Sequence, residues 1–199
     1  MASASFRPSQ KALHWLTVLL VPVLYGMTYA EDLFARGSAA RATLWWLHIS
    51  LGLTLIGVTA LRIVARIVWG APPLPAAMKG LERLGAHAAL LTLYGLLVLV
   101  PLLGVATAWY RGMGVTLFGL FAIPSPVAAD RTVAHSIQGL HNLTATALLV
   151  LAGLHALAAL WHHYVRRDDV LTRMLPHRGA AAVSPRAPRQ SAFPARRPR

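Results

Sequence analysis

Long apolar stretches without charged residues recur four times along the chain. Residues 12–30, 42–61, 84–110 and 132–165 contain no Asp, Glu, Lys or Arg. A helix needs about 20 predominantly apolar residues to cross the hydrocarbon core of a bilayer. The first stretch ends at Glu31 without a small-residue cleavage site, so we expect it to stay in place rather than to be removed as a signal peptide. The pattern predicts an all-α membrane protein, a four-transmembrane-helix bundle with spans at about residues 12–30, 42–61, 87–108 and 138–163.

A fifth charge-free stretch, residues 112–129, is long enough for a span but is broken by three glycines and two prolines. We expect an interfacial loop there, and the basic residues favour the same interpretation. With four spans, 15 of the 19 Lys and Arg residues lie on the face that holds both termini. By the positive-inside rule, both termini are therefore expected to be cytoplasmic. The opposite, outer face carries the other four: Arg36, Arg41, Arg111 and Arg131.

The composition excludes several classes of protein. Hydrophobic residues make up 56% of the chain and charged residues only 13%, against about one quarter in soluble domains. The absence of cysteine excludes a disulfide scaffold, thiolate metal sites and covalent haem attachment. The net charge of +13 does not indicate nucleic-acid binding, because six arginines lie in residues 177–199, which we expect to be a disordered basic tail. Residues 1–176 then form a single four-helix domain.

Histidines within the predicted spans are the candidate functional residues, because polar side chains in a membrane are costly unless paired or ligated. Counted by depth, His14 and His155 lie near the cytoplasmic side, and His48 and His141 near the outer side. The two histidines of the fourth span are 14 residues apart, or about 21 Å along a helix. A lone membrane histidine is more often a hydrogen-bonding or proton-relay residue. Two depth-matched pairs instead favour two b-type haems, each with two axial imidazoles.

Arg62 and His162 each allow two interpretations, and His87 and His135 are two further histidines outside the proposed pairs. Arg62 reaches the depth of the inner pair, where it either meets a haem propionate or serves as a positive-inside anchor. His162 continues the helical stripe of His155 and either binds a quinone headgroup or belongs to an interfacial aromatic belt. His87 is an alternative partner for His155, because it opens the third span on the same side. His135 is expected to lie in a loop.

Short motifs in a fixed order resemble the bacterial cytochrome b561 family. The resemblance covers about residues 6 to 177, and its motifs follow the four spans. They are Lys11-Ala-Leu-His-Trp15, Leu47-His-Ile-Ser-Leu-Gly52, Leu93-Tyr94, Pro101-Leu-Leu-Gly104, Leu117-Phe-Gly119, Leu140-His-Asn142, Gly153-Leu-His155, Trp161-His-His-Tyr164 and Leu171-Thr-Arg-Met-Leu-Pro176.

The resemblance implies a dihaem oxidoreductase of the bacterial inner membrane. It places the axial ligands at His14, His48, His141 and His155, and it leaves His87 outside that set. The two adjacent histidines of the closing segment are most similar to the branch that oxidises superoxide and reduces ubiquinone. On this basis the four outer-face arginines, Arg111 and Arg131 together with Arg36 and Arg41, are expected to gather superoxide, and His162 is expected to lie at the ubiquinone site.

Two other functions remain open from the sequence. One is a haem b electron-transfer subunit that links the quinone pool to a redox protein partner. The other, from a different class, is a small transporter that uses histidines as proton or metal sites. A transporter is expected to carry carboxylates at mid-depth, and none of the six acidic residues lies there.

Overall fold

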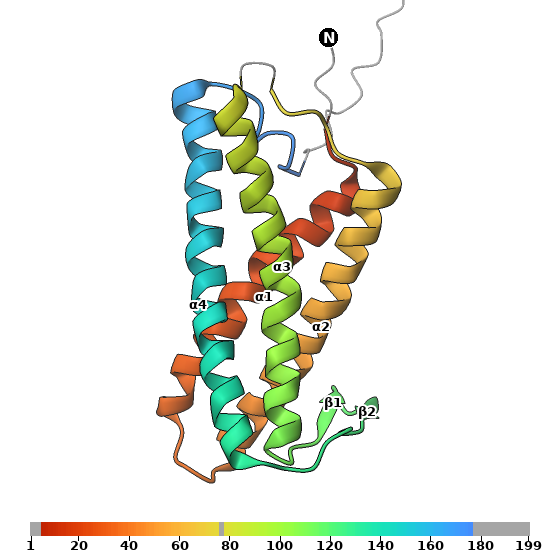
Figure 1. Ribbon diagram of the computed structural model, residues 1–199, viewed down its shortest axis with the longest axis vertical. Coiled ribbons are helices and arrows are strands. Elements are labelled where there is room, and N and C mark those ends of the chain that lie inside the picture. The colour runs from red at the N-terminus through yellow and green to blue at the C-terminus, as the bar shows by residue number, and fades with distance from the viewer. Residues whose placement is uncertain (1–4, 76–77, 177–199) are drawn as a thin grey trace, which may run out of the picture.

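The computed structural model describes residues 5–75 and 78–176, and four long helices dominate them (Figure 1). The predicted tail, residues 177–199, lies outside the described residues. Each long helix contains an apolar window that is long enough to cross a membrane. The helices are α1 (Pro8–Ala30), α2 (Ala39–Trp69), α3 (Gly80–Tyr110) and α4 (Arg131–Trp161).

Local sequence signals set the helix ends. Pro8 occupies the first turn of α1, where its missing N–H costs nothing. Ser38 caps α2 by accepting a hydrogen bond from the Arg41 backbone N–H, and Asp130 caps α4 in the same way. Because Asp130 starts α4 at Arg131, His135 is an exposed helical residue, and the prediction that it lies in a loop was wrong.

The helices associate mainly as two pairs, α1 with α2 and α3 with α4, and α2 also contacts α3. α1 crosses behind the other helices at a steep angle, so it contacts α4 only sparingly (Figure 1). The buried core is aliphatic and draws on all four helices: Leu20, Leu24, Leu55, Val58, Leu97, Val100 and Leu148. α4 therefore packs more closely on α3 than on α1 and α2.

The outward faces of the helices are apolar as well. Leu19, Ile67, Leu91 and Leu143, one from each helix, are all more than 60% exposed. In water such surfaces would be a liability, whereas lipid tails solvate them at no cost. The distribution of apolar residues agrees with helices that contact a bilayer.

One end of the bundle, here called the hairpin end, is closed by the segment between α3 and α4. It contains two short antiparallel strands, β1 (Val115–Leu117) and β2 (Phe121–Ile123), so residues 112–129 form no fifth helix. Ser50 of α2 fixes this hairpin: its buried hydroxyl donates to the Thr116 carbonyl and accepts from the Phe118 N–H, each at 3.1 Å. The 3-10 helix η1 (Glu31–Leu33) lies at the same end.

The opposite end, here called the terminal end, is closed by the chain after α4. A π-helical turn, η2 (His162–Arg166), ends at Arg167 in a left-handed conformation, φ 54°. Residues 167–176, here called the strap, then run back over the start of α1. There Lys11 Nζ donates to the Leu175 carbonyl oxygen and Trp15 Nε1 to the Met174 carbonyl oxygen, both at 2.9 Å.

Candidate functional site

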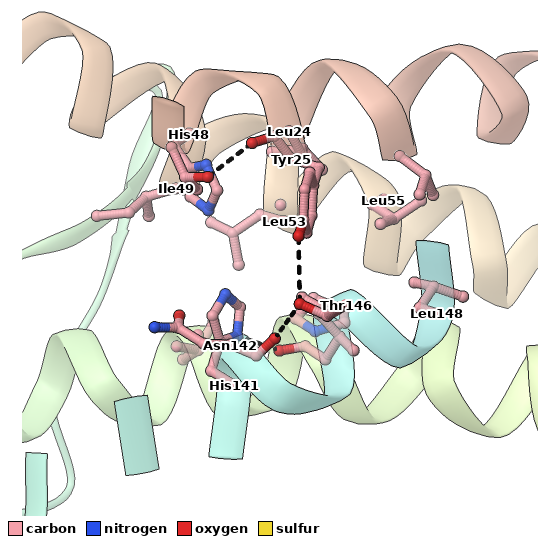
Figure 2. Close-up of a pocket in the computed structure, with 18 of the residues that line it drawn as sticks. Leu24, Tyr25, His48, Ile49, Leu53, Leu55, His141, Asn142, Thr146 and Leu148 are labelled. Atoms are coloured by element: carbon pink, nitrogen blue, oxygen red, sulfur yellow. Dashed lines mark hydrogen bonds between the residues drawn. The ribbon is translucent and has the colours of Figure 1, made fainter. Parts of the chain in front are cut away.

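Two histidines face each other near the hairpin end (Figure 2). His48 projects from α2 and His141 from α4, and their ring centroids are 6.4 Å apart. Two imidazoles that bind one metal ion from opposite sides have centroids about 6 Å apart, because each metal–nitrogen bond is about 2 Å. The spacing of this outer pair therefore suits a metal held between the two rings.

Main-chain carbonyls orient both rings. His141 Nδ1 donates to the Val100 carbonyl oxygen at 2.9 Å, and the His48 ring is hydrogen-bonded to the backbone of Leu24 (Figure 2). Nδ1 of His48 is buried without a hydrogen-bond partner in the described part of the chain. Metal-binding histidines commonly hold one ring nitrogen on a carbonyl and leave the other for the metal. A buried nitrogen without a partner is costly, which is a second indication of a ligand here.

A cavity of about 450 Å³ contains the outer pair. Small residues make the room: a Cβ placed on Gly52 would meet no atom within 4 Å, whereas one placed on Gly104 would lie 3.1 Å from His141 Cε1. The cavity is lined by apolar side chains from all four helices, as is typical of cofactor sites.

Hydroxyl groups form one edge of this cavity and join α1 to α4. The Tyr25 hydroxyl lies 3.2 Å from Thr146 Oγ1, and the Tyr29 hydroxyl donates to that of Tyr25 at 3.4 Å. Thr146 in turn donates to the Asn142 carbonyl oxygen at 2.9 Å (Figure 2). Asp32 also lines the cavity. This edge thus offers neutral donors and one carboxylate.

The second pair, His14 on α1 and His155 on α4, lies near the terminal end and is organised around a cation. Arg62 of α2 places Nη2 3.3 Å from His14 Nδ1, and its charge acts on both histidines. The guanidinium carbon lies 5.3 Å from the ring centroid of Tyr94 on α3. All four helices therefore meet at this inner pair, at the depth expected for Arg62.

Arg62 has no carboxylate within ion-pair distance among residues 5–75 and 78–176. A partly buried charge without a counterion is expensive in a membrane helix, and such residues usually serve a ligand. Arg62 therefore offers the inner pair a place for an anionic group.

The described residues contain no group of three or more His, Cys, Asp or Glu side chains placed to bind a metal ion. A site with two histidines needs its remaining ligands from elsewhere, and a porphyrin supplies four nitrogens in one plane.

A comparison with known protein families identifies the family of this chain. The family described as prokaryotic cytochrome b561 matches residues 5–177. This chain belongs to the prokaryotic cytochrome b561 family. The resemblance seen in the sequence motifs is thereby confirmed, and the chain is a bacterial membrane oxidoreductase of a family that transfers electrons through b-type haem.

Individual relatives of this cytochrome b561 are similar over nearly their whole length. The probable superoxide oxidase CybB of Yersinia pestis is 32% identical over 170 residues, covering 84% of this chain and 93% of the relative. Cytochrome b561 homolog 2 of Escherichia coli K12 is 32% identical, with 82% and 87% covered. Cytochrome b562 of Cereibacter sphaeroides is also 32% identical, with 83% and 92% covered.

The outer site of this cytochrome b561 fits a b-type haem well. Three features of the described residues suit a flat iron macrocycle: the opposed rings, the unpartnered nitrogen of His48 and the glycine-lined cavity. The inner site offers a histidine from α1, a histidine from α4 and a cation for a carboxylate.

Two other histidines from the sequence analysis stand apart from both pairs. His87 is exposed and its Nδ1 donates to the Arg83 carbonyl of its own helix at 2.7 Å, away from the inner pair. His162 lies in η2, and its Nδ1 is 2.5 Å from Asp168 Oδ2.

The outer-face arginines differ in their surroundings. Arg111 and Arg131 are exposed at the hairpin end, where the Asp130 N–H donates to the Tyr110 carbonyl and so joins the chain beside them. Arg36 is exposed as well, whereas Arg41 forms an ion pair with Glu31.

Sequence reasoning missed Asp168 and gave no role to Tyr94. Asp168 follows His162 by six residues, a spacing that brings no two side chains together in a regular helix. The π turn and the left-handed Arg167 bring them together. Tyr94 stood within a family motif, and counting depth along the third span would have placed it level with Arg62.

Proposed function

We propose that this protein is a superoxide:ubiquinone oxidoreductase that holds two haem b groups and conducts electrons across the membrane. Two superoxide anions give up two electrons and become two O₂, and one ubiquinone takes these electrons with two protons to become ubiquinol. The main support is that α4 carries one histidine of each pair, 14 residues or about 21 Å apart. The relative named as a probable superoxide oxidase supports the choice of substrate.

In this proposal the four paired histidines would hold the two haem irons. His48 and His141 hold one haem at the hairpin end, and His14 and His155 hold the other at the terminal end. When bound, haem b supplies one-electron redox chemistry that its axial ligands and surroundings tune. Arg62 binds a propionate carboxylate of the inner haem.

The hairpin end collects the substrate. We place both termini in the cytoplasm, because the Lys and Arg residues gather at the terminal end. The hairpin end then faces the periplasm, where the superoxide anion is trapped by its charge. The exposed side chains of Arg111 and Arg131 raise its local concentration, whereas the charge of Arg41 is offset by Glu31.

The terminal end delivers electrons to ubiquinone. Asp168 holds Nδ1 of His162, which leaves Nε2 to hydrogen-bond a quinone carbonyl and pass it a proton. Trp161 and Tyr164 are exposed beside His162, as in an interfacial belt, and quinone reaches this level laterally from the lipid.

Stopped-flow spectroscopy of the haem-loaded protein tests the proposal. Superoxide is expected to reduce the haems faster than it dismutates, and added ubiquinone to reoxidise them. Arg131→Glu slows the reduction, and the loss shrinks as salt screens the field. Arg83→Glu makes the same change of charge at the terminal end and leaves the reduction rate unchanged.

Reduction no faster than spontaneous dismutation would reject superoxide as the substrate. The chain would then be an electron-transfer subunit for another redox protein, a role that the names of the cytochrome b561 homolog and cytochrome b562 relatives leave open.

A further inference from the structure

The two histidine pairs differ in the charge beside them. Arg62 lies 3.3 Å from His14, its charge acts on His155 as well, and it has no carboxylate partner among the described residues. The inner pair therefore lies in a cationic environment.

The outer pair lies among neutral groups and one acid. Its rings are held by the Val100 and Leu24 backbones. The polar edge of its cavity consists of hydroxyl and amide groups, and Asp32 is the one carboxylate among the described residues that line it. No lysine or arginine lines this cavity in the described part of the chain.

We propose that this asymmetry gives electron flow its direction: Arg62 raises the reduction potential of the inner haem above that of the outer haem. The inference rests on the proposed binding of two haems, but not on superoxide as the electron donor. Each haem would take up one electron, which would remove one positive charge from its site.

A nearby cation stabilises the reduced state, and a nearby carboxylate the oxidised state. Between membrane helices the effective dielectric constant is low, so one fixed charge acts strongly over a few ångströms. Salt from the solvent screens a buried group only weakly. Arg62 therefore makes electron transfer from the hairpin end to the terminal end energetically favourable. It also offsets the negative charge of the haem propionates, and it does so at the inner site alone.

An equilibrium redox titration of the purified haem-loaded protein, followed by its absorption bands, tests this assignment without superoxide or quinone. The native protein is expected to titrate in two one-electron steps. His48→Ala, which keeps only the inner haem, retains the higher step, and His14→Ala, which keeps only the outer haem, retains the lower step. The opposite order would overturn the proposal.

Substitution of the arginine tests the cause. Arg62→Met is expected to lower the ratio of reduced to oxidised inner haem at a fixed potential by about tenfold or more, equivalent to about 59 mV for one electron. The outer step is expected to move by much less. Arg62→Lys keeps the charge and most of the potential. Arg66→Met removes a charge one turn further along α2 and serves as the matched control.

An inner step that stays in place in Arg62→Met, or an equal shift of both steps, would overturn the role of Arg62. If Arg62→Met fails to take up the inner haem, Arg62→Lys and the single-haem variants still decide the order of the potentials. A protein that shows the predicted steps but does not react with superoxide would reject the proposed substrate and keep this inference.

Discussion

The outer histidine pair is held by the main chain, and the inner pair by a side chain. His141 is fixed by a carbonyl of α3 and the His48 ring by the backbone of α1. His14 instead contacts the guanidinium group of Arg62. A carbonyl sets the angle of a ring but adds no net charge, whereas Arg62 adds a full positive charge. The two histidine pairs thus lie in two different electrostatic environments.

The two ends of the bundle are also closed differently. The hairpin is fixed to α2 by Ser50, a residue with no exposed surface, two positions from His48. The strap is fixed to α1 through Lys11 and Trp15, and Trp15 follows His14 directly. The hairpin and the strap are therefore each bonded to a helix that carries a nearby histidine. Each histidine pair and its end of the bundle thus form one structural unit. Such units are expected to respond separately to substitution.

Removal of one of the proposed haem ligands has the largest expected effect. His141→Ala is expected to abolish binding of the outer haem and keep the inner one, because neither His14 nor His155 is among the described residues that line the cavity around His141. Pyridine haemochrome analysis then gives one haem per chain in place of two. His155→Ala is the mirror experiment and keeps the outer haem. Loss of both haems in either variant would show that the two sites do not form separately.

The next largest effect is expected on the transfer of electrons to ubiquinone, and it tests whether this step belongs to the terminal end alone. His162→Ala is expected to slow reoxidation of the reduced haems by ubiquinone about 100-fold, the lower range for loss of a general acid. Haem content and reduction by superoxide stay unchanged, because His162 lies at the terminal end. Stopped-flow mixing of the pre-reduced protein with ubiquinone measures the rate.

Two further variants control this experiment. Asp168→Asn weakens only the orientation of the His162 ring and is expected to slow reoxidation less. His163→Ala removes an adjacent imidazole, whose ring packs on Tyr164, and is expected to have no effect. Equal slowing by His162→Ala and His163→Ala would assign the loss to disruption of the interface instead of a specific site.

Hydropathy and histidine depth were sufficient to predict the helices and the placement of the pairs. Four apolar windows gave the four long helices, and counting along them placed His48 level with His141. Both arguments use only the length of a helix per residue and the thickness of a bilayer. These quantities hardly vary between proteins, which explains why they predict the helices and the depth of the histidines so well.

The sequence did not predict contacts that depend on irregular backbone. The hairpin came from a segment expected to be a loop, since two strands of three residues leave almost no periodic signal. Asp168 meets His162 through a π turn, and no helical periodicity anticipates that contact. The close approach of Gly104 to His141 depends on how tightly α3 packs on α4, which residue spacing within one helix does not encode.

The smallest expected effect concerns this glycine. A Cβ on residue 104 would lie 3.1 Å from His141 Cε1, so the ring must move by a few tenths of an ångström in Gly104→Ala. The movement disturbs the hydrogen bond from His141 Nδ1 to Val100, and with it the ring position from which His141 would bind the proposed haem. We expect the outer haem to dissociate a few-fold faster to an acceptor apoprotein, whereas the inner haem, held from α1 and α4 near the terminal end, keeps its rate.

Gly139→Ala is the matched control, because Gly139 also lies within a helix and a Cβ there would meet nothing within 4 Å. Both substitutions replace glycine by a better helix former, worth about 1 kcal/mol in a helix interior. Any difference between them therefore reports the position of the His141 ring and not the stability of the helix. Equal rates of haem loss from both variants would show that the outer ring has room to adjust, and that main-chain carbonyls constrain it less than the comparison of the two pairs implies.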